Sequence, residues 1–583
     1  MSAFLLASMF ASPAFAAPSP LQSSSRVLHT VSVHSQVSLL DPSVTTQSLV
    51  GGLPFCQSGK TSTILCYTPS FLKTAYNFPS TSGEDGLTGK GQTIVIVDAF
   101  GSPTIQSDLN TFDSAFGIPA ATVTVLCGPT WTGASTDTCP VNTIADLGTA
   151  PNAGLCGATG WAEETTLDVT MSHGLAPKAH IVLVVSNDCF DSSIYTAEMA
   201  VVNQHQYRGS VMSQSFGEPD NLVTCTLLDL TGTSCIANDP TLLDQPNAVF
   251  QTATQRHWTI IASSGDDGAN ENARVLGTGE LVPSFPATSP LVLAAGGTQG
   301  SPYGGQYGPL ASHSESCAAK ATCNTGLVII NGGPNGCGTA LRPGAPTSCF
   351  PVGYGGEGTW NEFTHGFGLG TSSGGGVSVL YSRPDYQENT PESVTTLLGN
   401  TVQVTGRSTP DVSFNSAIHG GFLVPLGFIN NPCISSACPG PIWGVFGGTS
   451  AASPAWAGII ALLNQANGHP VGFLNPQIYE LGASSSEGSH GNGNQVSNQG
   501  SGNHDSEKAA PFHDITTGEN SDCAGKTCTL LQFTNPPPPG VPSPVFVHLV
   551  LDGFSASNGY DMATGWGTPN VAAFIQALAE NGN

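Results

Sequence analysis

Short apolar runs recur along this chain of 583 residues, and segments with a helical pattern separate them. The runs lie at residues 92–98, 123–126, 179–185, 211–215, 258–263 and 290–295. Continuous apolar runs of this length are typical of strands that are buried on both faces. The helical patterns cover residues 103–116, 161–174, 192–206 and 241–256. We therefore expect an α/β fold with a mostly parallel central sheet, helices on both faces, and chemistry at the carboxyl ends of the strands.

Charged side chains are scarce, at 9% of the residues, and 40 acidic residues outnumber 14 basic ones to give a net charge of −26. This balance argues against nucleic acid as a partner, because phosphate backbones bind basic surfaces. A chain with few ionised groups has few ion pairs to lose on acidification, and many of its carboxylates become neutral near pH ~4. The composition therefore fits a protein that works in acid, and it equally fits an ordinary acidic secreted protein.

Residues 1–17 have the apolar core and the Ala14-Phe15-Ala16 pattern of a secretory signal peptide. We expect a secreted, extracellular protein in which residues 18–65 form a short N-terminal segment and residues 66–583 form the main domain. Residues 301–360 are rich in Gly and Cys and predict a disulfide-stapled loop insertion. No later apolar run reaches the length of about 18 residues that a membrane span needs, so we predict none.

The 16 cysteines are best interpreted as disulfides, because the predicted signal peptide places the chain in an oxidising compartment. Many cysteines lie in close pairs, of which Cys225 and Cys235 are an example. Four further cysteines are more widely spaced, and the sequence does not decide how they pair; they are Cys127, Cys139, Cys156 and Cys189.

The sequence Gly447-Gly448-Thr449-Ser450 precedes a long apolar helix. Two glycines allow a tight turn, and the helix N-terminus offers free backbone N–H groups and the positive end of the helix dipole. Ser450 could therefore be a nucleophile whose own N–H stabilises an oxyanion. The alternative is an ordinary Thr/Ser cap on a buried helix.

A serine nucleophile needs a base, and no histidine motif supplies one. His173 is expected to be a helix-end residue. Glu164 and Asp168 are four residues apart, so on a helix they share one face and can share a proton, whereas Glu163 points about 100° away. Asp266 follows the apolar run 258–263, where a protonated carboxyl could donate to an oxyanion. A solvated acidic helix face and an Asp-Gly turn are the alternatives.

Together these three motifs, in this order, resemble the sedolisins, or serine-carboxyl peptidases, a family of acid endopeptidases with a subtilisin-like fold. The resemblance covers roughly residues 66–575. It implies Ser450 as nucleophile, Glu164 as base, Asp168 as the residue that orients Glu164, and Asp266 in the oxyanion hole. Asp98 lies where subtilisins carry an aspartate of their triad, and without a matching histidine we interpret it as a supporting residue.

The resemblance also implies one calcium ion in the segment 514–569. The carried-over ligands are the carboxylates of Asp514 and Asp561 and the carbonyls of Ile515, Ser557 and Gly559. Ser557 stands where the family usually has a glycine, and a carbonyl ligand survives that change if the backbone angles do. Hard oxygen donors of this kind suit calcium.

By the same resemblance, Ser213, Ser215, Gly374 and Gly375 line the substrate cleft. One departure concerns the N-terminus, because sedolisin precursors usually carry a large folded prodomain and only about fifty residues separate the predicted signal from the apparent catalytic start. Zymogen control is therefore in doubt, whereas the site residues are unaffected.

The sequence thus predicts a secreted, monomeric, calcium-binding serine-carboxyl endopeptidase that hydrolyses proteins or peptides in acid through an acyl-enzyme on Ser450. Three alternatives remain open. The chain could be a catalytically silent binding or surface protein on a peptidase scaffold, a conventional Ser-His-Asp hydrolase, or a tripeptidyl-peptidase with one end of the cleft blocked.

Overall fold

The computed structural model describes residues 27, 29–33, 36–40, 55–58, 62–80, 86–127, 152–229, 231–300, 354, 356–362, 370–418, 420–429, 441–487, 509–523, 525–532 and 545–580. The predicted signal peptide and most of the predicted insertion at 301–360 lie outside these residues.

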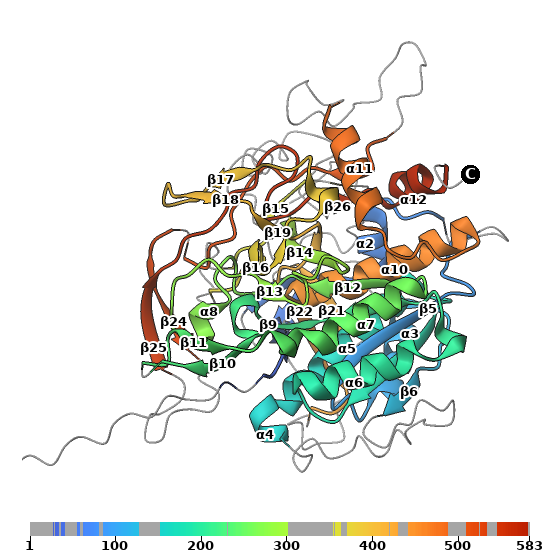
Figure 1. Ribbon diagram of the computed structural model, residues 1–583. Coiled ribbons are helices and arrows are strands. Elements are labelled where there is room, and N and C mark those ends of the chain that lie inside the picture. The colour runs from blue at the N-terminus through green and yellow to red at the C-terminus, as the bar shows by residue number, and fades with distance from the viewer. Residues whose placement is uncertain are drawn as a thin grey trace, which may run out of the picture.

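An eight-stranded sheet forms the centre of the molecule (Figure 1), with the order β15-β14-β12-β8-β5-β7-β6 and with β20 beside β14. Its strands are β5 (Thr93–Ala99), β6 (Thr124–Cys127), β7 (His180–Ser186), β8 (Val211–Gln214), β12 (Thr259–Ser263), β14 (Leu293–Gly300), β15 (Glu357–Thr359) and β20 (Val412–Asn415). Every pair in it is parallel except β14 with β15, which is antiparallel. The predicted α/β fold with a mostly parallel sheet is confirmed.

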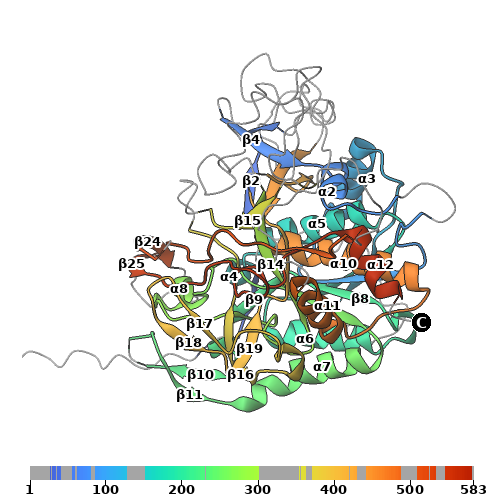
Figure 2. The ribbon, with the colours of Figure 1, turned by 90° about the horizontal axis from the view of Figure 1, so that it is seen from above.

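Successive side chains of β5 enter two different cores, as the period of a strand requires. Ile94 and Ile96 belong to one buried cluster, and Val95 and Val97 belong to the other. The first core is covered by α2 (Pro69–Ala75), α3 (Ile105–Phe116), α5 (Ala158–Leu175), α10 (Thr449–Asn467) and α12 (Val571–Glu580). The second is covered by α6 (Asp191–Val202) and α7 (Asp244–Gln255). Figure 2 shows α5 and α10 on one side of the sheet and α6 and α7 on the other.

The predicted helices and strands exist, and their ends differ by a few residues. The helix predicted at 161–174 begins three residues earlier, at Ala158. The helix predicted at 192–206 ends at Val202 and is followed by a separate 3-10 turn. The run at 290–295 becomes β14 only from Leu293, because a turn closed by the Val292 N–H and the Ser289 carbonyl (3.1 Å) precedes the strand.

Smaller sheets surround the central one. A five-stranded sheet has the order β2-β22-β21-β4-β3, and a three-stranded sheet has the order β1-β9-β13. Their strands are β1 (Ser32–Val33), β2 (Gln36–Leu39), β3 (Phe55–Ser58), β4 (Ser62–Tyr67), β9 (Phe216–Pro219), β13 (Ser284–Phe285), β21 (Gly421–Leu426) and β22 (Ile442–Gly447). Two-stranded pairs are β10 (Cys225–Leu228) with β11 (Cys235–Asn238), β16 (Gly376–Ser382) with β19 (Gly406–Thr409), β17 (Ser393–Thr395) with β18 (Thr401–Gln403), β23 (Phe512–His513) with β26 (Thr568–Pro569), and β24 (Thr527–Gln532) with β25 (Val545–Val550). The remaining helices are α4 (Ala153–Cys156), α8 (Asn272–Val275) and α11 (Asn475–Glu487).

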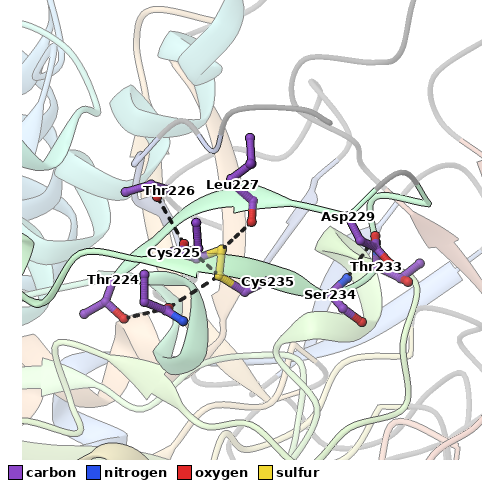
Figure 3. The surroundings of a disulfide bond; sticks show 10 residues. Thr224, Cys225, Thr226, Leu227, Asp229, Thr233, Ser234 and Cys235 are labelled. Carbon is purple, nitrogen blue, oxygen red and sulfur yellow. Dashed lines mark hydrogen bonds between the residues drawn. A yellow bond between two sulfur atoms is a disulfide. The ribbon is translucent and has the colours of Figure 1, made fainter. Parts of the chain in front are cut away.

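Two complete disulfides lie within the described residues. Cys225 and Cys235 join β10 to β11, as Figure 3 shows, and this predicted pair is confirmed. Cys156 pairs with Cys189 and ties the end of α4 to the loop before α6. The sequence left the pairing of Cys127, Cys139, Cys156 and Cys189 open, and the structure joins Cys156 to Cys189. In the part of the chain that the structure describes, no helix has both the length and the apolar character of a membrane span.

Candidate active site

The strand β22 turns sharply into α10 and places Ser450 at the start of that helix. Gly448, which precedes the helix, has a φ of 91°, a conformation that residues with a side chain rarely adopt. A Cβ on Gly447 would lie 2.4 Å from the carbonyl oxygen of Ser416, so this position also requires glycine. Ser450 is fully buried and is the second residue of the helix. It therefore lies at the positive end of the helix dipole.

Ser215 connects Ser450 to a buried carboxyl group. The Ser450 hydroxyl donates to the Ser215 carbonyl oxygen at 3.4 Å. In turn the Ser215 hydroxyl donates to Asp168 Oδ1 at 2.9 Å and lies 3.4 Å from the Ser450 carbonyl oxygen. Ser215 stands between β8 and β9, so the carboxyl end of a central strand brings the nucleophile candidate and the carboxyl group together.

Three buried carboxyl groups form a cluster behind Ser215. Glu164 and Asp168 lie on one face of α5 and are both fully buried, as is Asp98 near the end of β5. Burial raises the pKa of Asp168 well above its usual range, and the charges of Asp98 and Glu164 add to this effect. Burial raises the pKa of Asp98 to about 7. Such a cluster holds protons where isolated carboxyls would be ionised.

Asp266 lies against the first residue of α10, immediately before Ser450. Its Oδ1 accepts hydrogen bonds from Thr449 N at 2.7 Å and from the Thr449 hydroxyl at 2.9 Å. Burial raises the pKa of Asp266 to about 8, although the two hydrogen bonds from Thr449 lower it. Below that pH the carboxyl is mainly protonated, so it can donate a hydrogen bond through Oδ2. A φ of 109° at Gly265 turns the chain out of β12 and into this position.

The most obvious histidine is engaged elsewhere. His173 is fully buried, and its Nε2 lies 2.9 Å from Asp113 Oδ1 on α3. It also lies nine residues after Glu164, which corresponds to about 13 Å along a helix. The structure therefore pairs His173 with Asp113 near the end of α5, as the expected helix-end role requires.

The four residues predicted to line the cleft have different surroundings. Ser215 lies at the site, whereas Ser213 is fully buried, with its hydroxyl 2.9 Å from that of Ser453. Gly374 N donates to the Gly265 carbonyl at 2.8 Å, and a Cβ on Gly374 would lie 2.0 Å from the Ser264 carbonyl oxygen. A Cβ on Gly375 would meet a carbonyl oxygen at 2.1 Å. Gly374 is thus required for the backbone to approach the loop before Asp266, and Gly375 is required for its approach to the carbonyl of Met562.

The N-terminal segment contacts the site, which the sequence did not predict. Ser32 and Val33 of β1 pair with Gly217 and Phe216 of β9, directly after Ser215. On the other side, Gln36 of β2 pairs with Gly447, directly before the Gly448 turn. Its side-chain amide lies 3.5 Å from Asp266 Oδ2. The alternation of apolar and polar residues in Val31-Ser32-Val33 and in Gln36-Val37-Ser38-Leu39 is the signal that could have revealed these strands.

Two of the predicted calcium ligands, Asp514 and Asp561, accept hydrogen bonds from backbone N–H groups of residues 557–559. Asp561 Oδ2 accepts from Ser557 N at 2.8 Å, and Asp514 Oδ2 accepts from Gly559 N at 2.9 Å. Ile515, the residue after Asp514, is buried. Burial raises the pKa of Asp561 to about 7, and neither carboxylate takes part in the four ion pairs found between described residues. Two carboxylates that face the same stretch of backbone, with no cationic side chain paired to either, are suitable ligands for a hard cation.

Comparison with known proteins bears on this arrangement. The profile of the subtilase family matches residues 148–502, more than half of the chain and the part that holds Glu164, Asp168, Asp266 and Ser450. The chain belongs to the subtilase family. Among characterised relatives of this subtilase, kumamolisin of Bacillus sp. (strain MN-32) is 25% identical over 514 residues, 88% of this chain and 63% of kumamolisin. Tripeptidyl-peptidase 1 of Mus musculus is 26% identical over 348 residues, 58% of this chain and 40% of that protein.

A solved structure confirms the fold of this subtilase. Pseudomonas sedolisin, described as a serine-carboxyl proteinase complexed with two molecules of pseudo-iodotyrostatin, aligns with a TM-score of 0.54 at 20% identity, over 90% of this chain and 100% of that one. The predicted subtilisin-like fold and the predicted sedolisin resemblance are confirmed. The chain spans less than two thirds of the length of kumamolisin and of tripeptidyl-peptidase 1.

Proposed function

We propose that this subtilase is a serine-carboxyl endopeptidase that cleaves proteins or peptides in acid. The observation that carries the proposal is that Ser215 bridges Ser450 and Asp168. Its carbonyl oxygen accepts from the Ser450 hydroxyl and its hydroxyl donates to Asp168, whose pKa the charges of Asp98 and Glu164 help to raise. A serine linked to a carboxyl cluster suits catalysis in acid, because ordinary carboxyl pKa values lie near acid pH, where a carboxyl group can both take and return a proton.

Each residue has one role in the proposed reaction. The Ser450 hydroxyl attacks the scissile carbonyl while Glu164 takes its proton, and Asp168 orients Glu164 and shares the cluster proton. Protonated Asp266 and the Ser450 N–H donate to the oxyanion. Glu164 then protonates the leaving amine, and water repeats the sequence on the acyl-enzyme.

Endopeptidase rather than tripeptidyl-peptidase action is supported by the N-terminal segment. Described residues on both sides of the site, Ser32–Val33 and Gln36–Leu39, belong to one continuous stretch of chain. These residues are internal to the chain, and an internal stretch held beside Ser450 by strand pairing is the kind of substrate that an endopeptidase cuts. A tripeptidyl-peptidase instead needs one end blocked, so that only a free N-terminus fits.

The remaining assignments complete the proposal. Asp514 and Asp561, with the carbonyls of Ile515, Ser557 and Gly559, would hold one calcium ion, which would rigidify their loop and take no part in bond cleavage. We further propose a secreted monomer with a signal peptide at 1–17, a short N-terminal segment at 18–65 and a peptidase domain at 66–583.

The test compares matched variants in the hydrolysis of a denatured protein from acid to neutral pH. Ser450→Ala and Glu164→Gln should each abolish acid hydrolysis. Ser453→Ala, one turn further along α10, and Glu163→Gln, the half-buried neighbour on α5, should leave most of it. Mass spectrometry of the products should find internal fragments rather than a ladder of tripeptides.

Three outcomes contradict parts of this proposal. Hydrolysis that survives both Ser450→Ala and Glu164→Gln would mean that another site does the chemistry. A product ladder of tripeptides would establish the tripeptidyl-peptidase alternative. A folded wild-type chain without any hydrolysis would favour a silent binding protein.

A further inference from the structure

A second cluster of polar side chains lies outside the proposed catalytic residues. It consists of His29 in the N-terminal segment, Asp191 at the start of α6 and Glu218 on β9. One imidazole nitrogen and one oxygen from each carboxylate all lie within 4.8 Å of one another. Three donors that converge to this extent are candidates for a shared ligand.

Backbone pairing fixes the three residues relative to one another. Asp191 N donates to the His29 carbonyl at 3.2 Å, and Val31 N donates to the Cys189 carbonyl at 2.9 Å. On the opposite edge, Ser32 pairs with Gly217, the residue before Glu218. The Cys156–Cys189 disulfide further anchors the loop that leads to Asp191. The fold therefore sets the backbone positions of all three residues.

Each of the three side chains has a buried nitrogen or oxygen atom without a hydrogen-bond partner among the described residues. Glu218 is only 5% exposed, and its Oε1 is buried without a hydrogen-bond donor. Asp191 Oδ1 and His29 Nδ1 are likewise buried without a partner among the described residues. None of the four ion pairs between described residues includes either carboxylate. Buried carboxylates without a cation are costly, and a bound metal ion is one of the ways in which proteins offset that cost.

We propose that His29, Asp191 and Glu218 bind a divalent transition-metal ion, of which Zn²⁺ is the representative. An imidazole nitrogen suits Zn²⁺ and related ions, whereas Ca²⁺ and Mg²⁺ take oxygen ligands. Three protein ligands would leave a fourth position for water. This site is separate from the predicted calcium ligands in the segment 514–569, which are all oxygen donors.

The origin of the ligands gives the ion a structural consequence. His29 belongs to the N-terminal segment, while Asp191 and Glu218 belong to the body of the domain. The ion would therefore clip residues 29–33 onto β9 and α6, beside the proposed cleft. Because the ion binds only when the segment is docked, it stabilises the docked state by mass action. This inference does not depend on the proposed peptidase activity.

The experiment uses the full secreted chain carrying Ser450→Ala, so that no self-proteolysis can remove residues 27–33. After chelation and dialysis, Zn²⁺ is titrated by calorimetry, and the zinc content is measured after a second dialysis. His29→Gln and Glu218→Gln should each bind one zinc ion fewer than this parent. The exposed His469→Gln is the matched control and should bind as the parent does. The zinc content of each variant is compared with that of the parent, because the chain has 14 histidines and the others supply background zinc sites.

Hydrogen exchange gives an independent readout in the unaltered segment. Zinc should slow exchange in peptides that cover residues 29–33 at least tenfold in the parent, and it should not do so in His29→Gln or Glu218→Gln. Equal zinc content in the parent and both variants would overturn the proposal. So would unchanged exchange at residues 29–33 in the parent, and this result needs no variant to fold.

Discussion

Asp266 can be tested by two substitutions that keep or remove a hydrogen-bond donor. In Asp266→Asn the side-chain oxygen can still accept from Thr449 N, which turns the NH2 group toward the position of Oδ2. In Asp266→Ala both functions are lost. If Asp266 acts as a neutral donor to the oxyanion, Asn should retain most of kcat/KM in acid and Ala should not.

The raised pKa sets the expected magnitudes. Burial raises the pKa of Asp266 to about 8, so at about pH 4 only about one carboxyl in ten thousand is ionised. Wild type and Asp266→Asn therefore both present a neutral donor, and their kcat/KM values should agree within about tenfold. Losing an oxyanion donor typically costs ~10²–10³ in turnover, equivalent to about 3–4 kcal/mol, which is the loss expected for Asp266→Ala.

The assay is kcat/KM for a fluorogenic peptide from acid to mildly alkaline pH, with circular dichroism to confirm folding. As pH rises through about 8, wild type loses its donor and Asp266→Asn does not, so the ratio of mutant to wild type should increase. Asp267→Asn is the control, because this neighbour pairs with Arg274 instead. An Asn variant as inactive in acid as the Ala variant, with both folded, would refute the donor role.

Three further predictions concern groups around the site. Burial raises the pKa of Glu198 from 4.5 to about 8, so between these pH values the folded state keeps a proton that the unfolded chain releases. The stabilisation of the folded state by this proton is complete below about pH 4.5 and is lost as pH rises through about 8. Glu198→Gln should therefore reduce the drop in unfolding free energy between about pH 5 and about pH 8 by up to roughly 4 kcal/mol, measured by denaturant titration, and an unchanged drop would contradict this. Ser215→Ala removes the hydrogen bond that lowers the pKa of Asp168, so the acid limb of the pH–rate profile should move to higher pH; an unmoved limb would separate Asp168 from the reaction. In a chain carrying His29→Gln, which removes the proposed zinc site, chelation by EGTA should lower the melting temperature by several degrees, and adding Asp561→Asn should remove most of this effect; equal shifts in both would place the calcium ion elsewhere.

The central sheet was predictable because its strands are buried on both faces. β5 is a run of 7 residues rich in Ile and Val, so its length and its β-branched residues favour a buried strand over a helix. Helix ends were less certain, since α5 is apolar or small for several residues before Trp161 and its start depends on Gly157, which has a φ of 66°. The short strands β1 and β2 have an alternating pattern, but it extends over only a few residues each, and the sequence does not indicate that β9 and β22 are their partners.

The site was predictable where spacing along one element fixed it. Glu164 and Asp168 share a face because a helix brings residues four apart together, and the two glycines before Ser450 permit only a sharp turn. Ser215 was expected in the cleft, but its position between Ser450 and Asp168 depends on how β8 meets α10, which local sequence does not encode. The contact of Gln36 with Asp266 is of the same kind, because it joins residues 230 positions apart.

Burial and scarcity of charge have one common physical consequence in this chain. Asp98, Asp168 and Asp266 all have pKa values raised chiefly by burial, and no basic side chain is among the causes that act on them. A chain in which only 9% of residues are charged has few cations to spare for such carboxyls, so they stay neutral well above the usual range. Carboxyl groups kept neutral in this way can donate hydrogen bonds and share protons, which is what the proposed acid mechanism requires of them. The composition that alone fitted an ordinary acidic protein equally well therefore favours acid chemistry once the carboxyls are located at Ser450.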